Sequence, residues 1–213
     1  MIMNATVFCV NEENFNTAVL SATECLDKGG LVVFPTETVY GIGADAFDES
    51  AIKNLYDKKQ RPYDKPLLMH ISGIEMAEEI AFLDDKAREL INRFTPGPLT
   101  LVVKAKSVVP KIALSGGDTV GLRFPSNKTF LEISRRFGRP IAATSANISG
   151  CRSAKNVDDL CAVKEIADVI VTDGDSELGL ESTIVSLVGE KPRILRVGSF
   201  PKEKIEEVLG VCD

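Results

Sequence analysis

Apolar and polar positions follow two different periods along this chain. Between Phe15 and Leu26, apolar residues recur every three or four positions and stop before Gly29, which predicts an amphipathic helix that ends at glycine. A continuous apolar run over residues 31–34 follows immediately and predicts a buried strand. The first clear elements are therefore a helix followed by a strand.

The remaining patterns continue this interleaving. Further helices are predicted over residues 50–58, 74–82, 86–94, 129–137 and 202–209. Strands are predicted over residues 67–71, 99–103, 120–124, 141–144, 169–172, 183–188 and 194–197. This alternation favours an α/β fold, and because the last strands lack a helix between them, we expect one mixed sheet with flanking helices.

No repeat or low-complexity linker separates these elements. The turn at residues 95–98 joins a predicted helix directly to a predicted strand, and apolar patterning resumes after it. A length of 213 residues, with 44% hydrophobic and 26% charged residues, suits a globular protein with a sizeable core. We therefore expect a single domain over residues 1–213.

The sequence shows no sign of membrane insertion or export. No segment approaches the roughly 18 apolar residues of a membrane span, and the first ten residues lack a cationic start followed by an apolar run. We expect a soluble cytoplasmic protein with no membrane association.

The cysteines and the histidine limit the metal chemistry. The five cysteines are odd in number and form no C-x-x-C pair, which argues against a disulfide framework or a structural zinc site. Cys9 and Cys25 lie in apolar patterns and are predicted to pack in the core. His70 is the only histidine, so a multi-histidine metal site is excluded, and we predict no metal held by the protein alone.

The charge distribution is acidic overall and basic in one segment. A net charge of -6 and a pI near 5.0 disfavour a broad nucleic-acid surface. Residues 53–65 nevertheless carry five basic and two acidic residues, a net +3. Lys53 and Lys58 can be explained by a solvated helix end, where cations favour the helix dipole. Lys59 and Arg61 are interpreted as ligand-binding residues, because the Arg-Pro step takes the chain away from the helix.

Two short segments suit a polyanionic ligand. Arg61 can hold phosphate oxygens with two N–H groups and Lys59 adds a mobile point charge, as a nucleoside triphosphate requires. Residues 144–150 form a small-residue turn whose hydroxyl and amide groups can hold phosphate or ribose oxygens. The common ATP-binding loop G-x-x-x-x-G-K-[ST] is absent. A relaxed G-x-G-x-x-A match at residues 41–46 lies six residues beyond the preceding strand, too far for a dinucleotide fingerprint.

Several other polar residues lie at strand ends or in loops, and each has two explanations. Thr36 and Thr38 follow the first predicted strand and either contact a ligand or satisfy backbone groups of the turn. His70 is either a core residue or, at the end of its strand, a ligand contact. Arg123 and Arg196 end apolar strands, so we expect both at the rim of the sheet, in a salt bridge or in ligand binding.

An ordered set of motifs resembles the YrdC-like family, the threonylcarbamoyl-AMP synthases, in its short single-domain form. The matching segments are residues 29–30, 35–41, 59–62, 66–70, 96–100, 121–123, 145–150 and 181–196. The resemblance implies a twisted α/β sheet around a deep, locally positive cavity. It also implies a nucleotidyltransferase that makes L-threonylcarbamoyl-AMP and pyrophosphate from L-threonine, bicarbonate and ATP with Mg²⁺. A separate transferase complex then modifies tRNA, and a weak tRNA contact is expected.

The same resemblance implies roles for individual residues. Lys59 and Arg61 are expected to be catalytic. ATP is expected to contact Lys59, Tyr63, Thr119, Ser145, Asn147, Ser153 and Arg196. L-threonine is expected to contact Thr36, His70, Arg123 and Ser182, with Arg123 facing its carboxylate.

Two other functions are weighed against this one. A non-catalytic RNA-binding module is disfavoured by the acidic pI and by the few aromatics available to stack bases, with no Trp and three Tyr. A carbamoyl-adenylate enzyme of hydrogenase maturation is disfavoured because that activity normally sits in a much longer chain. Pyrophosphate release that depends on threonine separates the synthase from both.

Overall fold

The strands join into one continuous sheet in the computed structural model, which describes residues 5–212. Within that range the strands are β1 (Thr6–Cys9), β2 (Val32–Phe34), β3 (Gly41–Asp45), β4 (Leu68–His70), β5 (Ala81–Phe82), β6 (Leu99–Ala105), β7 (Thr119–Arg123), β8 (Ile141–Ser145), β9 (Val169–Thr172), β10 (Thr183–Ser186) and β11 (Arg193–Arg196). Their order is β1-β9-β2-β3-β8-β4-β7-β6-β10-β11, and β5 pairs with β6. Parallel pairs such as β4 with β7 occur beside antiparallel pairs such as β6 with β7. The prediction of a mixed sheet is confirmed.

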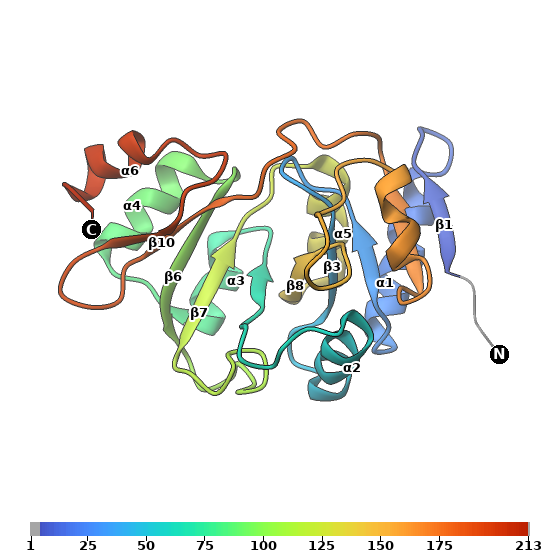
Figure 1. The fold of residues 1–213 in the computed structure, drawn as a ribbon, viewed down its shortest axis with the longest axis horizontal. Coiled ribbons are helices and arrows are strands. Elements are labelled where there is room, and N and C mark those ends of the chain that lie inside the picture. The colour runs from blue at the N-terminus through green and yellow to red at the C-terminus, as the bar shows by residue number, and fades with distance from the viewer. Residues whose placement is uncertain (1–4, 213) are drawn as a thin grey trace.

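Helices cover both faces of this twisted sheet. They are α1 (Phe15–Asp27), α2 (Glu49–Lys59), α3 (Ile74–Ile80), α4 (Asp85–Phe94), α5 (Lys128–Phe137) and α6 (Lys202–Leu209), together with the 3₁₀ helix η1 (Asp158–Val163). Figure 1 shows α1 and β1 at one end of the molecule, α4 and α6 at the other, and β3, β4, β7 and β8 between them. No helix in residues 5–212 is long and apolar enough to cross a membrane.

Local capping explains where α2 and α5 begin and end. The Asp48 carboxylate accepts hydrogen bonds from the first backbone N–H groups of α2, and the Asn127 side chain does the same for α5. α5 ends at Gly138 with φ 71°, which glycine adopts without strain. α2 ends at Gln60 in the same left-handed region, with φ 53°. The chain therefore turns sharply just before Arg61, as the sequence predicts.

The core has two parts, one on each face of the sheet. Leu31 and Val33 face the larger part, and Val32 and Phe34 face a smaller part between the sheet, α1 and α5. Successive side chains of a strand point to opposite faces, so a continuous apolar run is what a strand buried on both faces requires. Truncating a buried aromatic of this core, such as Phe130, to alanine would cost about 3–5 kcal/mol of stability.

Some local predictions are wrong. β1, β3, β5 and η1 are not predicted, and the predicted helix over 74–82 ends at Ile80, after which the chain pairs with β6. β3 contains Gly41 and Gly43, and glycine disfavours strands. A Cβ at Gly41 would lie 2.5 Å from the Phe34 ring, so close packing requires glycine there. Cys9 is exposed because β1 is an edge strand, so its predicted burial is wrong.

Candidate active site

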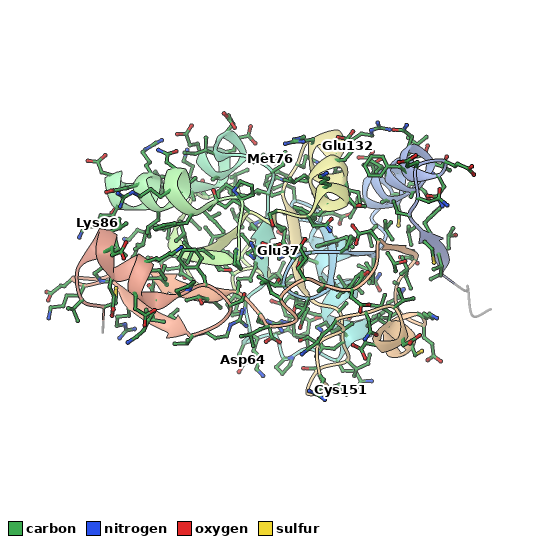
Figure 2. The ribbon with its side chains drawn as sticks, turned by 90° about the horizontal axis from the view of Figure 1, so that it is seen from above. Glu37, Asp64, Met76, Lys86, Glu132 and Cys151 are labelled. Carbon is green, nitrogen blue, oxygen red and sulfur yellow. The ribbon has the colours of Figure 1, made fainter. Side chains whose placement is uncertain are left out.

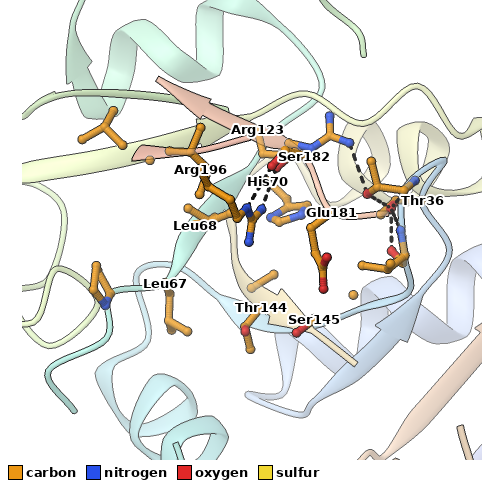
Figure 3. A pocket seen from close by; sticks show the side chains of 18 of the residues that line it. Thr36, Leu67, Leu68, His70, Arg123, Thr144, Ser145, Glu181, Ser182 and Arg196 are labelled. Carbon is orange, nitrogen blue, oxygen red and sulfur yellow. Dashed lines mark hydrogen bonds between the residues drawn. The ribbon is translucent and has the colours of Figure 1, made fainter. Parts of the chain in front are cut away.

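A cavity of about 320 Å³ lies over one face of the central strands (Figure 3). Every second residue of β4 and β7 contributes to its wall, as the alternation of side chains in a strand dictates, and the end of β8 adds Ala143, Thr144 and Ser145. The volume falls at the lower end of the range of small-molecule sites, about 300–1,000 Å³. Among residues 5–212 its lining contains three guanidinium groups, from Arg61, Arg123 and Arg196, but a single carboxylate, that of Glu181.

Arg61 is held at one end of the cavity by the chain that follows α2. Its Nε donates to the Lys65 carbonyl (3.1 Å) and Nη2 donates to the Pro66 carbonyl (2.9 Å). Nη1 lies 3.3 Å from the Thr144 hydroxyl oxygen and donates to it. Because each terminal nitrogen carries two hydrogens, these contacts fix the guanidinium and leave N–H groups for a ligand. Burial lowers the pKa of Arg61, but guanidinium remains charged in proteins.

Lys59 lies behind the wall of the cavity. Its side chain is 1% exposed, and Nζ donates to the Ser145 carbonyl (2.6 Å), the Asn147 carbonyl (2.6 Å) and Asn147 Oδ1 (2.7 Å). Burial, and secondarily the charge of Arg61, lower the pKa of Lys59 to about 7. Three acceptor oxygens need three donors, which only the charged ammonium supplies. Lys59 therefore fastens the loop after β8 to the end of α2.

The loop after β8 is ordered by its own side chains. Ser145 Oγ donates to Asn147 Oδ1 (2.7 Å), and Asn147 Nδ2 donates to the Cys151 carbonyl (2.6 Å). Ser145 lines the cavity, whereas Lys59 and Asn147 do not. The predicted pair of basic and small polar segments is thus joined directly, and contact of Lys59 and Asn147 with ATP stays a prediction.

Thr36 and Ser182 line the opposite end of the cavity. Thr36 Oγ1 donates to the Val39 carbonyl (2.6 Å) and accepts from the backbone N–H of Thr38 (3.2 Å), so its hydroxyl satisfies the turn, one of the two explanations given by the sequence. Ser182 Oγ shares a hydrogen bond with the Thr100 hydroxyl (2.8 Å) and accepts from Arg196 Nη2 (3.2 Å). Both hydroxyls have fixed orientations before any ligand binds.

Arg123 forms a buried ion pair and does not lie at the rim. Its Nη2 is 2.8 Å from Glu37 Oε1, and the two side chains are 2% and 5% exposed. Nη1 donates to the carbonyls of Gly97 and Phe124. Figure 2 shows Glu37 near the middle of the molecule. The predicted rim position of Arg123 is wrong because β7 is a central strand whose end is covered by the loop that carries Glu37. Arg196, on edge strand β11, is exposed as expected.

His70 is buried and faces the same end of the cavity. Its ring meets Phe34 and Phe130 edge-on, with ring centroids 5.6 and 5.8 Å away. Nδ1 is buried and has no hydrogen-bond partner within the described part of the chain. Burial, and then the positive charge of Arg123, lower the pKa of His70 to about 3. The imidazole is therefore neutral at physiological pH and can offer a hydrogen-bonding nitrogen to a ligand.

The neutral state of His70 should make stability fall with acid. The pKa of His70 is about 3 in the folded state and about 6.5 when unfolded, so between these values only the unfolded state gains the proton. The contribution of the neutral His70 to the free energy of unfolding is therefore complete above pH 6.5 and is lost as the pH falls toward 3. Between pH 6.5 and 4.5 we expect the wild type to lose about 2–3 kcal/mol more than His70→Gln. Urea unfolding of both proteins at the two pH values measures this, and parallel losses would contradict the prediction.

Three other predicted nucleotide contacts lie in different surroundings. Thr119 lines the cavity at the start of β7. Ser153 does not line it, but its Oγ donates to Glu181 Oε1 (2.7 Å). Tyr63 is 45% exposed, stacks on Tyr56 with ring centroids 4.7 Å apart, and donates to Asp57 Oδ1 (2.7 Å). The contacts of these residues with ATP stay predictions.

Sequence reasoning gave no specific role to two carboxylates of the site. Glu181 lines the cavity and Glu37 holds Arg123. Both lie inside segments singled out by their motifs, directly beside the predicted contacts Thr36 and Ser182. The sequence signal that could have identified them is an acidic residue within a segment that is expected to bind anionic ligands.

Comparison with known proteins decides the family. The Sua5/YciO/YrdC family model, described as "Telomere recombination", matches residues 24–198. The chain belongs to this family. The match includes every predicted site residue and all strands that line the cavity.

Named relatives of the Sua5/YciO/YrdC family resemble the chain over most of its length. The threonylcarbamoyl-AMP synthase of Pyrococcus abyssi (strain GE5 / Orsay) is 43% identical over 185 residues, 86% of this chain and 54% of its own length. That of Bacillus subtilis (strain 168) is 39% identical over 197 residues, 90% of this chain and 56% of its own. A Mycobacterium tuberculosis relative (strain ATCC 25618 / H37Rv) is 41% identical over 216 residues, 98% of this chain and 97% of its own. The chain thus spans little more than half of the first two relatives.

Solved structures confirm the predicted fold. The crystal structure of P. abyssi Sua5 complexed with L-threonine matches with a TM-score of 0.89 and 39% identity, over 99% of this chain and 61% of that one. A double variant of P. abyssi Sua5 matches with a TM-score of 0.93 and 39% identity, over 98% and 61% of the two chains. Escherichia coli YciO, 24% identical with a TM-score of 0.78 over 92% of this chain and 94% of its own, shares the fold.

Proposed function

We propose that this chain carries the activity of an L-threonylcarbamoyladenylate synthase, a nucleotidyltransferase that makes threonylcarbamoyl-AMP and pyrophosphate from L-threonine, bicarbonate and ATP. The observation that carries the proposal is the cavity, which places three guanidinium groups around fixed hydroxyls and a buried neutral histidine. Relatives named threonylcarbamoyl-AMP synthase and the L-threonine complex of P. abyssi Sua5 support the choice of substrates.

The two ends of the cavity suit the two large substrates. Arg61, Thr119 and Ser145 at one end offer a cation and hydroxyls to the triphosphate and ribose. Thr36, His70, Arg123 and Ser182 at the other end offer uncharged polar groups and a neutralised cation to a small amino acid. A charge-assisted hydrogen bond contributes about 1.5–3 kcal/mol, so two such bonds to a developing charge can supply several powers of ten in rate.

The chemistry proceeds in two bond-forming steps. The threonine ammonium gives a proton to bicarbonate, which then splits into carbon dioxide and water. The resulting amine attacks carbon dioxide and releases a second proton to solvent, which forms the C–N bond of a carbamate. A carbamate oxygen then attacks the α-phosphorus of ATP, and the bond to the bridging oxygen breaks as pyrophosphate leaves with the electron pair. Arg61 and Arg196 would stabilise charge on the phosphate oxygens, and the cavity limits the access of water to the labile carbamate.

Mg²⁺ is proposed to accompany ATP. Within residues 5–212, no group of three or more His, Cys, Asp or Glu side chains could hold a metal ion. The donor set of the cavity wall fits a cation that keeps phosphate oxygens and waters as its main ligands, as Mg²⁺ does at phosphate sites. Thr119 and Ser145 lie on strands on either side of β4, so one of these hydroxyls would contact the ion, which would offset the negative charge of the phosphates.

The proposed product connects this chain to tRNA modification. A mixed anhydride of a carbamate and AMP is an activated acyl donor, so a transferase complex that delivers the threonylcarbamoyl group to tRNA would consume it. A cytoplasmic location and a weak tRNA contact follow from this role as further proposals. The acidic net charge makes the tRNA contact local at most.

Pyrophosphate release by the purified chain tests the proposal. The reaction contains ATP, Mg²⁺, L-threonine and bicarbonate, and each component is omitted in turn. Release that requires all of them, with threonylcarbamoyl-AMP detected by mass spectrometry, supports the synthase. Absence of release despite tight RNA binding would favour the RNA-binding module instead.

A further inference from the structure

Glu181 is a carboxylate on the wall of a cavity whose other charged side chains are arginines. Its neighbours on that wall include Arg61, Arg123 and Arg196, and the proposed substrates bring a triphosphate, a bicarbonate and a carboxylate. We propose that Glu181 binds the α-ammonium group of the amino-acid substrate, an assignment that rests on the proposed function. A cationic group is the ligand part that a carboxylate in this position attracts, and the zwitterionic amino acid brings one.

The Glu181 carboxylate is oriented into the cavity. Figure 3 shows it pointing into the space between Arg196, Ser182 and Ser145. Oε1 accepts a hydrogen bond from Ser153 Oγ (2.7 Å). No hydrogen bond within residues 5–212 involves Oε2, and no ion pair in that part of the chain includes Glu181. One oxygen thus fixes the side chain and the other is available to a ligand.

The backbone of Glu181 is also held firmly. Its carbonyl accepts from the Ser199 backbone N–H (2.9 Å) and from Ser199 Oγ (3.2 Å). Gly198 packs so closely that a Cβ there would lie 2.2 Å from the Glu181 carbonyl oxygen. The carboxylate is therefore presented from a rigid turn, which suits the orientation of a ligand.

The electrostatic surroundings keep Glu181 charged. The hydrogen bond from Ser153, and to a smaller degree the charges of Arg196 and Lys155, lower the pKa of Glu181 below its ordinary value. It is an anion at neutral pH and repels phosphate, bicarbonate and carboxylate groups. Among charged groups only a cation gains from it, and a charged hydrogen bond of this kind contributes about 1.5–3 kcal/mol.

The position of Glu181 favours the ammonium group over a metal ion. It directly precedes Ser182, which lies at the amino-acid end of the cavity, while its carboxylate extends toward Ser145 at the nucleotide end. An ammonium bound there lies at the boundary between the two ends, where the nitrogen must meet carbon dioxide and the carbamate must then reach the α-phosphorus. Mg²⁺ held with ATP takes most of its ligands from phosphate oxygens and water, so a contact of Mg²⁺ with Glu181 would show as weaker binding of Mg²⁺-ATP rather than of threonine alone.

Binding of L-threonine in the absence of ATP and Mg²⁺ tests the assignment. Isothermal titration compares L-threonine with its analogue 2,3-dihydroxybutyrate, in which a hydroxyl replaces the amine, on wild type, Glu181→Gln and Glu190→Gln. Glutamine can still accept from Ser153, and Glu190 is an exposed control away from the cavity. We expect Glu181→Gln to weaken threonine binding about 10- to 100-fold, to leave binding of the analogue unchanged, and to keep the wild-type melting temperature. Glu190→Gln should behave as wild type.

Four outcomes would overturn the assignment. Unchanged threonine affinity in Glu181→Gln rejects it, while the proposed function stands if wild type still releases pyrophosphate. Equal losses for threonine and the analogue would show a general disturbance of the cavity, and weaker binding of Mg²⁺-ATP alone would show a metal ligand. If wild type binds no threonine, both this assignment and the proposed function fail.

Discussion

Arg61→Ala should lower threonine-dependent pyrophosphate release about 10²- to 10³-fold, the usual cost of removing one group that stabilises developing charge. The guanidinium lies at the nucleotide end of the cavity, and contacts with Lys65, Pro66 and Thr144 fix its orientation before ATP binds. Its free N–H groups would meet phosphate oxygens as negative charge builds up during attack on the α-phosphorus. Alanine removes both the charge and the orientation.

Two matched variants separate this role from a general effect on folding. Arg61→Lys keeps the charge but loses the planar group that binds two oxygens together, so its rate should lie between those of wild type and alanine. Arg135→Ala removes an exposed arginine of α5 and should leave the rate unchanged. The measurement is initial pyrophosphate release at saturating threonine, with thermal melts for each protein. A rate near that of wild type for Arg61→Ala would remove Arg61 from the catalytic mechanism.

Periodicity identifies the fold because burial is local and regular here. The strand 31–34 and the helix that starts at Phe15 are recognised because each buried face repeats with the period of its element. β3 is missed for the opposite reason. Its glycines allow Phe34 and Ile141 of the neighbouring strands to pack closely against it. Such contacts between strands leave no pattern in the local sequence. Edge strand β1 is also missed, although its segment Thr6–Cys9 is apolar and β-prone enough to predict a strand.

The candidate site likewise contains residues that local motifs identify and contacts that only the folded chain creates. Residues such as Arg61, Ser145 and Ser182 line the cavity because their motifs lie at the ends of predicted strands or just after a predicted helix. The contacts between site residues that are far apart in the sequence were not predictable. Glu37 and Arg123 are separated by 86 positions, and a pairing over that distance appears only when the sheet brings β7 beside the loop before β3. The role of Lys59 in fastening residues 145–147 depends on the same kind of long-range contact.

Glu37→Ala should destabilise the folded state by about 3–5 kcal/mol, because it leaves the Arg123 charge buried without its partner. One further contact is lost with the carboxylate, because Oε2 accepts from the Ser126 backbone N–H (3.2 Å). Glu37→Gln should cost less, since its amide oxygen can still accept from Arg123. Urea unfolding at pH 7 measures the loss.

Two comparisons test whether the loss of stability in Glu37→Ala arises from the burial of its ion pair with Arg123. Asp27→Ala removes one partner of the exposed Arg139 contact, also 2.8 Å long, and should cost about 1 kcal/mol or less. Glu37→Leu combined with Arg123→Met removes both charges and should recover part of the stability lost in Glu37→Ala, because no uncompensated ion then remains in the interior. The double variant should nevertheless bind L-threonine poorly, since it lacks the cation at the amino-acid end. If Glu37→Ala costs no more than Asp27→Ala, the ion pair does not hold the site together, and Arg123 must be oriented mainly by the carbonyls of Gly97 and Phe124.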